Sequence, residues 1–193
     1  MSQTEDLSPL FDISGRKLFE RRMIILSESI HAHSAKLVNE KLLAMEATDT
    51  TKPIWLFLNS PGGEVSSGFS IYDTMRFIRP EIKVIVSGIA ASIATIILLG
   101  AKKEYRYALP NSRLLIHQPL ISGSIQGQAS DIEIHAKEIL KTREKIAKIY
   151  HQETKQTMEK ITKDMERDFW MTPEDAVEYG LVTKIIQNWN DVA

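Results

Sequence analysis

The sequence contains no cysteine, which excludes disulfide bonds, a thiolate nucleophile and thiolate metal sites and fits a reducing compartment. It also has no long apolar run, because the longest, Ile93 to Leu99, is interrupted by Thr95 and is far too short to span a bilayer. Neither sign of charge dominates. The 24 basic and 25 acidic residues give a formal net charge of −1, which argues against nucleic acid or a membrane as a main partner.

The residues that are present are those of an ordinary globular protein. Of the 193 residues, 43% are apolar and 25% are charged, enough for a real core under a solvated surface. No repeat or linker-like composition divides the chain, so we predict one domain over residues 18–193 after a variable N-terminal segment, 1–17. About the first ten residues of that segment are expected to be disordered or removable. Because the N-terminus is polar and acidic and lacks a secretory pattern, we expect a cytoplasmic protein.

Apolar periodicity predicts strands that alternate with helices. The predicted strands cover residues 22–27, 52–58, 82–86, 104–108, 113–117 and 181–186. The predicted helices cover residues 34–47, 66–78, a short apolar stretch from 92, 130–154, and a turn-capped segment that starts at Thr172-Pro173 and ends at Gly180. This alternation predicts an α/β fold with a largely parallel sheet. The long helix over 130–154 carries charges outside one apolar stripe, and we interpret it as an element of assembly.

Three segments follow predicted strands and carry candidate chemistry. They are NSPGG (59–63), SGIAAS (87–92) and HQP (117–119). In open α/β sheets, active sites form beyond the carboxyl ends of the strands, so these segments are expected to share one site.

Ser92 is the candidate nucleophile within this group. It follows small residues after a strand and opens an apolar helix, where backbone N–H groups can stabilise an oxyanion. The alternative is that Ser92 only caps that helix, as serine often does.

His117 is the candidate general base, because a neutral imidazole has a pKa near working pH and His117 ends an apolar strand. The alternative is a strand-end histidine satisfied by backbone. The other histidines compete on chemistry but not on position, since they flank a helix start (His31, His33) or lie on the long helix (His135, His151).

A carboxylate must orient the imidazole, and the residues alone leave its identity open. Asp168 precedes two aromatic residues that could shield it from water, while Asp131, Asp164 and Asp175 remain alternatives. The pair Gly62-Gly63 likewise has two readings: a tight turn that requires positive φ, or one half of an oxyanion hole.

Six motifs together closely resemble the ClpP family, the proteolytic subunits of the Clp protease. They are NSPGG (59–63), SIYDTM (70–75), GxAAS (88–92), PNSR with IHQP (110–119), GQASDIEIHAKEIL (127–140) and ERDFWM (166–171). Their order and spacing match from about Arg22 to Ile186. The resemblance implies a ClpP/crotonase-like fold of repeated β-β-α (spiral) units, with a protruding handle helix in the region of about 120–155.

The resemblance also assigns roles to particular residues. It implies a catalytic triad of Ser92, His117 and Asp168, with the backbone N–H groups of Gly63 and Ile93 as oxyanion donors. The residues expected to bind substrate main chain are Gly63, Glu64, Val65, Ser66, Gln118 and Pro119. No metal and no cofactor is expected on this chain.

Assembly and partners are implied in the same way. Two heptameric rings, of one or two kinds of subunit, would close into a tetradecamer served by a Clp AAA+ ATPase that uses the ATP and unfolds substrates. The residues expected at the ring–ring interface are Gln126, Gly127, Gln128 and Arg167. Those expected to dock the ATPase are Trp55, Phe57, Phe77 and Tyr107, for which ordinary packing is the alternative.

The leading hypothesis is therefore a serine endopeptidase that degrades unfolded proteins to short peptides inside a closed chamber. A second hypothesis is a regulatory or structural ring subunit with little activity unless it is assembled with a second ClpP-type subunit. A third, a crotonase-like acyl-CoA enzyme, is disfavoured because that chemistry usually relies on glutamates near the thioester.

Overall fold

The computed structural model describes residues 8–119 and 128–192. Its strands are β1 (Met23–Leu26), β2 (Ile54–Ser60), β3 (Ile82–Ala91), β4 (Arg106–Ala108), β5 (Arg113–Ile116), β6 (Phe169–Met171) and β7 (Lys184–Ile185). Its α-helices are α1 (Ser8–Glu20), α2 (Ala32–Thr48), α3 (Val65–Phe77), α4 (Ile93–Leu99), α5 (Ala129–Thr154), α6 (Met158–Asp164) and α7 (Pro173–Tyr179). Two 3-10 turns, η1 (Lys103–Tyr105) and η2 (Trp189–Val192), complete the described elements.

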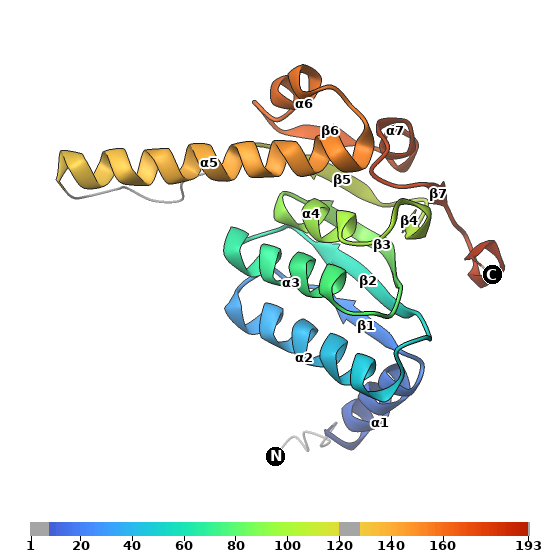
Figure 1. The fold of residues 1–193 in the computed structure, drawn as a ribbon. Helices are drawn as coiled ribbons and strands as arrows, with labels where there is room; N and C mark the ends of the chain where they lie inside the picture. The colour runs from blue at the N-terminus through green and yellow to red at the C-terminus, as the bar shows by residue number, and fades with distance from the viewer. Residues whose placement is uncertain (1–7, 120–127, 193) are drawn as a thin grey trace, which may run out of the picture.

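The sheet is mostly parallel, as the alternation of strands and helices predicted. Strands β1, β2, β3, β4 and β7 lie side by side in that order, and every pair among them is parallel. The second half of β3 continues past β4 and pairs in parallel with β5, while β6 runs antiparallel to β5. A long β3 therefore lets two strands share one side of it, which places β5 and β6 beyond the end of β4 (Figure 1).

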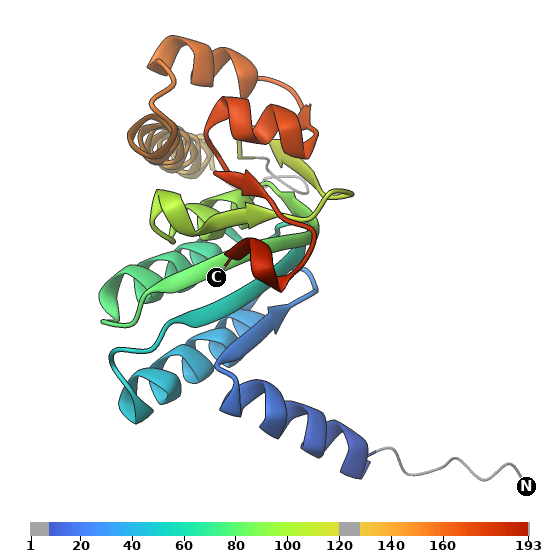
Figure 2. The same cartoon turned by 90° about the vertical axis from the view of Figure 1, so that its right-hand side faces the viewer.

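Helices cover one face of the sheet. In Figure 1, α2, α3 and α4 lie along the same side of β1, β2 and β3. The side chains of β2 alternate between fully buried (Ile54, Leu56, Leu58) and half-buried (Trp55, Phe57), as expected when only one face is fully covered. On the opposite face, the C-terminal turn η2 crosses in front of the strands (Figure 2). No described helix is both long and apolar enough to cross a membrane.

Helix α5 has two halves with different surroundings. Near its C-terminus, Ile146, Ala147, Ile149 and Tyr150 are buried in the main core. The N-terminal half extends away from the body of the protein (Figure 1), and three of its large apolar side chains are exposed: Ile132, Ile134 and Leu140. The apolar stripe predicted along this helix is thus buried only at one end, which leaves the other end available for a partner.

Several elements were not predicted. Helix α1 begins at Ser8 and crosses the expected boundary between residues 17 and 18, so of the expected disordered or removable segment of about ten residues, the disorder is wrong from Ser8 onward. The predicted strand over 104–108 starts as η1 and becomes extended only at Arg106. Helix α6 and strand β6 have no counterpart in the prediction, because each is short and has too few residues to show a period.

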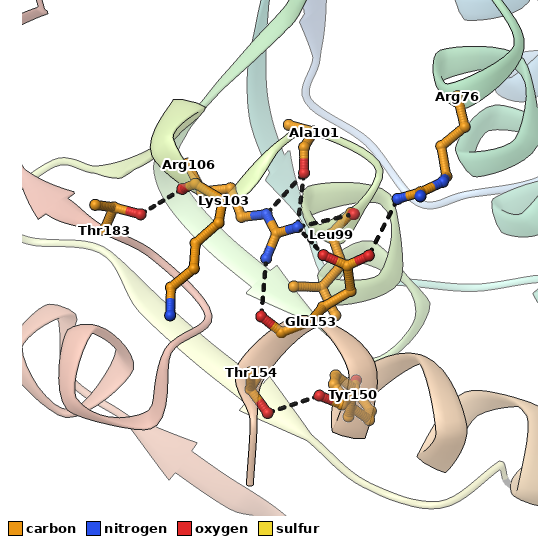
Figure 3. Close-up of polar contacts among 9 residues, drawn as sticks. All are labelled: Arg76, Leu99, Ala101, Lys103, Arg106, Tyr150, Glu153, Thr154 and Thr183. Atoms are coloured by element: carbon orange, nitrogen blue, oxygen red, sulfur yellow. Dashed lines mark hydrogen bonds and ion pairs between the residues drawn. The ribbon is translucent and has the colours of Figure 1, made fainter.

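A buried arginine ties α5 to the rest of the fold (Figure 3). Arg106 is fully buried, and its guanidinium donates to the carbonyl oxygens of Ala101 (2.7 and 2.8 Å) and Leu99 (3.3 Å). It also pairs with the carboxylate of Glu153, in the last turn of α5, which in turn accepts a hydrogen bond from Arg76 on α3 (3.1 Å). Burial lowers the pKa of Arg106 and the Glu153 carboxylate opposes that effect. One charged cluster thus joins α3, the loop before η1 and α5.

Replacing Arg106 with methionine is expected to lower the free energy of unfolding by about 3–5 kcal/mol, because it leaves carbonyl oxygens without donors and Glu153 without its buried partner. Urea unfolding at a fixed protein concentration measures the change. The matched control is Arg76→Met, since the Arg76 side chain is 49% exposed and such pairs contribute about 0–1 kcal/mol. Equal losses in the two variants would contradict this account of Arg106.

Candidate active site

Ser92 lies at the junction of β3 and α4 in a strained backbone conformation. Its φ is 57° and its ψ is −128°, a combination that non-glycine residues rarely adopt. The Ser92 N–H donates to the Leu115 carbonyl of β5 (2.9 Å), so the parallel pairing of β3 with β5 holds the residue in place. Within the described residues its side chain makes no capping hydrogen bond, which contradicts the capping alternative. Strain without a cap is typical of an exposed nucleophile on a strand-to-helix turn.

A bulge in β3 determines where Ser92 sits. The register of β2 with β3 shifts between Leu58 and Ser60, so Asn59 alone faces three residues of β3. The Asn59 Oδ1 accepts a hydrogen bond from the Ile89 N–H (3.1 Å), and its Nδ2 donates to the Ser27 Oγ beyond the end of β1 (2.8 Å). The predicted strand stopped at Val86 because Ser87-Gly88 reads as a turn. The side chain of Asn59 supplies the acceptor that keeps β3 extended to Ala91.

His117 and Asp168 are brought together by the antiparallel pairing of β5 with β6. The register matches Ile116 with Phe169, so His117 directly follows β5 and Asp168 directly precedes β6 at the same end of the pair. The regular register ends there, since the Gln118 N–H donates to the Met165 carbonyl (2.7 Å) and not to Arg167, which the register would set opposite Gln118. The pairing of three neighbouring strands thus gathers Ser92, His117 and Asp168 at one edge of the sheet.

The other carboxylates have different partners or positions. Asp164 accepts hydrogen bonds from Lys160 (2.7 Å) and from the Tyr179 hydroxyl (3.0 Å). Asp175 forms a capping box with Thr172, and the backbone hydrogen bond from Thr172 lowers its pKa. Asp131 lies in the first turn of α5. Of the four candidates, Asp168 is the one that directly precedes β6, the strand paired with the strand that ends before His117.

The remaining histidines are also placed elsewhere. His31 caps α2, where its Nδ1 accepts from the Ser34 N–H (3.2 Å), and His33 stacks against it. His135 and His151 lie on α5, and the Nδ1 of His151 is hydrogen-bonded with the Gln156 carbonyl (2.6 Å).

The glycine loop after β2 packs directly against Ser92. A Cβ on Gly62 would lie 2.6 Å from the Ala91 carbonyl oxygen and 2.7 Å from the Ser92 Cβ, so no larger residue fits. Gly63 forms a parallel bridge with Ile30 and has a φ of 150°. The Ile30 N–H donates to the Gly62 carbonyl and the Glu64 N–H donates to the Ile30 carbonyl, each at 2.8 Å. Both bonds point toward Ile30, so the N–H of Gly63 points to the opposite side of the loop.

Ile93 provides the second expected oxyanion donor. It is the first residue of α4, where the N–H has no acceptor within the helix. Its side chain is buried and lies against Gly68 of α3, where a Cβ would come within 2.2 Å of the Ile93 Cγ1. The side chain of Ile93, the residue after Ser92, is thereby held against α3.

The expected substrate-binding segment is only partly extended. Glu64 is the last extended residue, and Val65 and Ser66 form the first turn of α3, where they offer helical N–H groups in place of a strand edge. The Glu64 carboxylate accepts from the hydroxyls of Ser67 (2.6 Å) and Ser66 (3.0 Å), and these bonds lower its pKa.

On the other side of the site, the Gln118 side chain donates to the Glu166 carbonyl at 3.2 Å. Pro119 is the last described residue before the gap.

The three proposed catalytic side chains are not hydrogen-bonded to one another in the single chain. Within the described residues, no hydrogen bond joins Ser92, His117 and Asp168, and Asp168 is exposed. The strand pairing brings the three residues to one edge of the sheet without joining their side chains. The described residues also contain no group of three or more histidine, aspartate or glutamate side chains placed to hold a metal ion.

The residues expected at interfaces fall in separate places. Gln128 is the residue before α5 and Arg167 is an exposed neighbour of Asp168, while Gln126 and Gly127 lie outside the described residues. Three of the expected docking residues, Trp55, Phe57 and Tyr107, share the sheet face opposite the helices. Phe77 does not join them, since it ends α3 in the helical layer and is 82% exposed.

Trp189 is a member of the aromatic cluster that the sequence analysis missed. Its ring contacts Trp55 edge-on (centroids 5.0 Å apart) and Phe57 (6.1 Å). Trp189 and Phe57, together with Ile85 and Ile186, line a pocket of about 180 Å³. An aromatic residue close to the C-terminus was the available signal, but nothing in the sequence indicates which face η2 covers.

The sequence from residue 7 to residue 189 matches the family model described as Clp protease. The matched range contains all the strands, Ser92, the glycine loop, His117 and Asp168. The chain therefore belongs to the Clp protease family, the family of ClpP-type serine peptidases.

Proposed function

We propose that this chain is the proteolytic subunit of a self-compartmentalised serine protease in which Ser92, His117 and Asp168 form the catalytic triad. The observation that carries the proposal is the strand pairing. Ser92 follows β3, His117 follows β5 and Asp168 precedes β6, three adjacent strands whose relevant ends meet at one edge of the sheet. The proposal extends the family assignment to named residues.

The chemistry follows from these positions. His117 accepts the proton of the Ser92 hydroxyl as the oxygen attacks the peptide carbonyl, and then donates it to the departing amine. Asp168 holds the imidazole in the correct tautomer and stabilises its charged form. The N–H groups of Gly63 and Ile93 stabilise the negative oxygen of the tetrahedral intermediate. Water then releases the acyl group from Ser92 by the reverse sequence of proton transfers.

The binding of substrate is proposed to use main chain. Gly63 offers the backbone groups that point away from Ile30, Glu64 follows it in extended conformation, and the N–H groups of Val65 and Ser66 continue the row of donors. Gln118 and Pro119 border the other side. Recognition through backbone groups selects extended, unfolded polypeptide and depends little on its side chains.

The proposed assembly is a homo- or hetero-tetradecamer of two heptameric rings in the cytoplasm. The exposed apolar side chains on the projecting half of α5 support a ring–ring contact, which would also include residues 126–128 and Arg167. The cluster of Trp55, Phe57 and Tyr107 is proposed to dock a Clp AAA+ ATPase, which uses the ATP. Phe77 would take part only if a neighbouring subunit brings it to this cluster.

A second candidate function is supported by the unlinked triad. Because the side chains of Ser92, His117 and Asp168 are not hydrogen-bonded to one another in this chain, activity could require a second ClpP-type subunit that completes the alignment. The chain would then act chiefly as a structural or regulatory member of a mixed ring.

The test is to purify the protein, determine its assembly by native mass spectrometry, and treat it with a fluorophosphonate probe beside a fluorogenic short peptide. We expect labelling at Ser92, located by peptide mapping, together with peptide hydrolysis. Activity that appears only after a second ClpP-type subunit is added would favour the second candidate. A double ring that neither labels nor cleaves, even with that subunit and a Clp ATPase present, would refute both.

A further inference from the structure

The carbonyl oxygen of Ser92 is held as firmly as its N–H. It accepts a hydrogen bond from the Thr95 N–H (3.0 Å) and a second from the Thr95 Oγ1 (2.6 Å). Thr95 is the third residue of α4 and is fully buried. The side chain of Thr95 therefore adds a constraint to the strained peptide unit at Ser92 that an apolar residue could not supply.

A second hydroxyl reaches Thr95 from a distant part of the sequence. The Tyr150 hydroxyl of α5 lies 2.5 Å from the Thr95 Oγ1, and only 1% of Tyr150 is exposed. Since the single hydroxyl hydrogen of Thr95 is directed at the Ser92 carbonyl, Tyr150 must be the donor in this contact. Burial raises the pKa of the Tyr150 hydroxyl far above its ordinary value, so it keeps that hydrogen at any ordinary pH.

The surroundings of this pair are otherwise apolar. Every residue of α4 is buried, and Thr95 is the only polar one among Ile93, Ala94, Ile96, Ile97, Leu98 and Leu99. A buried hydroxyl without a partner costs stability, so a threonine here is tolerable because both of its hydrogen bonds are made. The two hydroxyls form one chain of hydrogen bonds from α5 to the backbone of Ser92.

The turn of α5 that carries Tyr150 is itself fixed to the core. The Thr154 Oγ1 donates to the Tyr150 carbonyl (2.6 Å), and Glu153 pairs with Arg106 (Figure 3). The opposite end of the same helix projects from the body with exposed apolar side chains. Within the described residues, the contact of Tyr150 with Thr95 is the polar contact between α5 and α4, so a change in the direction of α5 would act on α4 through it.

We infer that Thr95 and Tyr150 are positioning residues, which hold Ser92 in its reactive backbone conformation and couple it to the seating of α5. This inference depends on the proposed role of Ser92 as nucleophile. Neither residue contacts the reacting atoms. Their effect on the reaction is on the orientation of Ser92 and of the Ile93 N–H that follows it.

The test compares four variants by the second-order rate constant of fluorophosphonate labelling and by kcat and KM on a short peptide. Thr95→Val is expected to lower the labelling rate and kcat about ten- to a hundredfold with little change in KM, because one buried hydrogen bond to a carbonyl is lost and one donor is stranded. Tyr150→Phe is expected to lower both about three- to tenfold. Thr95→Ser keeps the hydroxyl and is expected to retain most of the wild-type rate.

The matched control is Ser112→Ala, which removes a buried hydroxyl-to-carbonyl hydrogen bond of similar length (2.7 Å, to Val86) that touches neither Ser92 nor α5. It should label at the wild-type rate even if it melts at a lower temperature. Native mass spectrometry confirms that the variants compared have the same assembly, and Tyr150→Phe remains available if Thr95→Val fails to fold. If the wild-type protein labels and the rates of Thr95→Val and Tyr150→Phe are unchanged, this inference alone is overturned. If the wild-type protein never labels, the proposed function is overturned and this inference falls with it.

Discussion

Replacing Ser92 with alanine is expected to lower kcat for peptide hydrolysis by roughly 10⁴- to 10⁶-fold and to abolish fluorophosphonate labelling. The nucleophilic oxygen is lost, and a residual rate over water from the oxyanion donors and from substrate binding is all that remains. The fold should be unaffected, since within the described residues the Ser92 side chain makes no capping hydrogen bond. The measurement is steady-state hydrolysis of a fluorogenic peptide by the assembled protein, with assembly checked by native mass spectrometry.

Ser70→Ala is the matched control for this change. Ser70 lies on α3, is exposed, and accepts a hydrogen bond from Asn39 (2.9 Å). It should keep wild-type kcat and wild-type labelling. If Ser92→Ala hydrolysed the peptide at the wild-type rate while Ser92 carried the label in the parent protein, the label would mark a reactive but non-catalytic serine and the proposed triad would be wrong.

Parts of the site could be predicted because strand ends can be read from local sequence. Ser92 and His117 each follow an apolar run, and the carboxyl ends of parallel strands meet at one edge of a sheet. The sequence alone could not select Asp168 among four carboxylates. That selection depends on the antiparallel pairing of β6 with β5, a contact between residues far apart in the chain that three residues of β6 are too few to signal.

The length of β3 was missed for a related reason. Small residues at 87–88 favour a turn in a local reading, whereas in the fold Gly88 makes room for Asn59, whose side chain replaces a main-chain acceptor. A side chain that completes a sheet from a neighbouring strand leaves no periodic pattern in the sequence. The same holds for Thr95 and Tyr150, which are separated by 55 positions and meet only when α5 docks on α4.

The long-range contacts that the local sequence does not predict have a common consequence for function. The local sequence predicts where the chemistry lies, while the contacts that set its geometry come from α5, β6 and the loop around Ile30. Each of these elements lies outside the motif that holds the serine. Conditions that move α5 should therefore change the reaction rate without any change in the catalytic side chains.

The glycine loop after β2, which bridges Ile30, provides the second large expected effect on kcat. Replacing Gly63 with alanine is expected to lower kcat about 10²- to 10³-fold, the usual cost of removing one oxyanion donor. A Cβ at this position would lie 2.1 Å from the Ile30 carbonyl oxygen, and the φ of 150° is unfavourable for any residue with a side chain. The loop must move away from Ile30, and the N–H of Gly63 moves with it.

The control for this change is Gly15→Ala, where a Cβ on the exposed face of α1 meets nothing within 4 Å. It should keep wild-type kcat. Gly63→Ala should still label with the fluorophosphonate, but more slowly and by a factor close to its loss in kcat, because the phosphonyl oxygen uses the same donors as the peptide carbonyl. This slow labelling separates it from Ser92→Ala, which cannot label at all. A folded, assembled Gly63→Ala protein with unchanged kcat would remove Gly63 from the oxyanion hole and leave Ile93 as the remaining proposed donor.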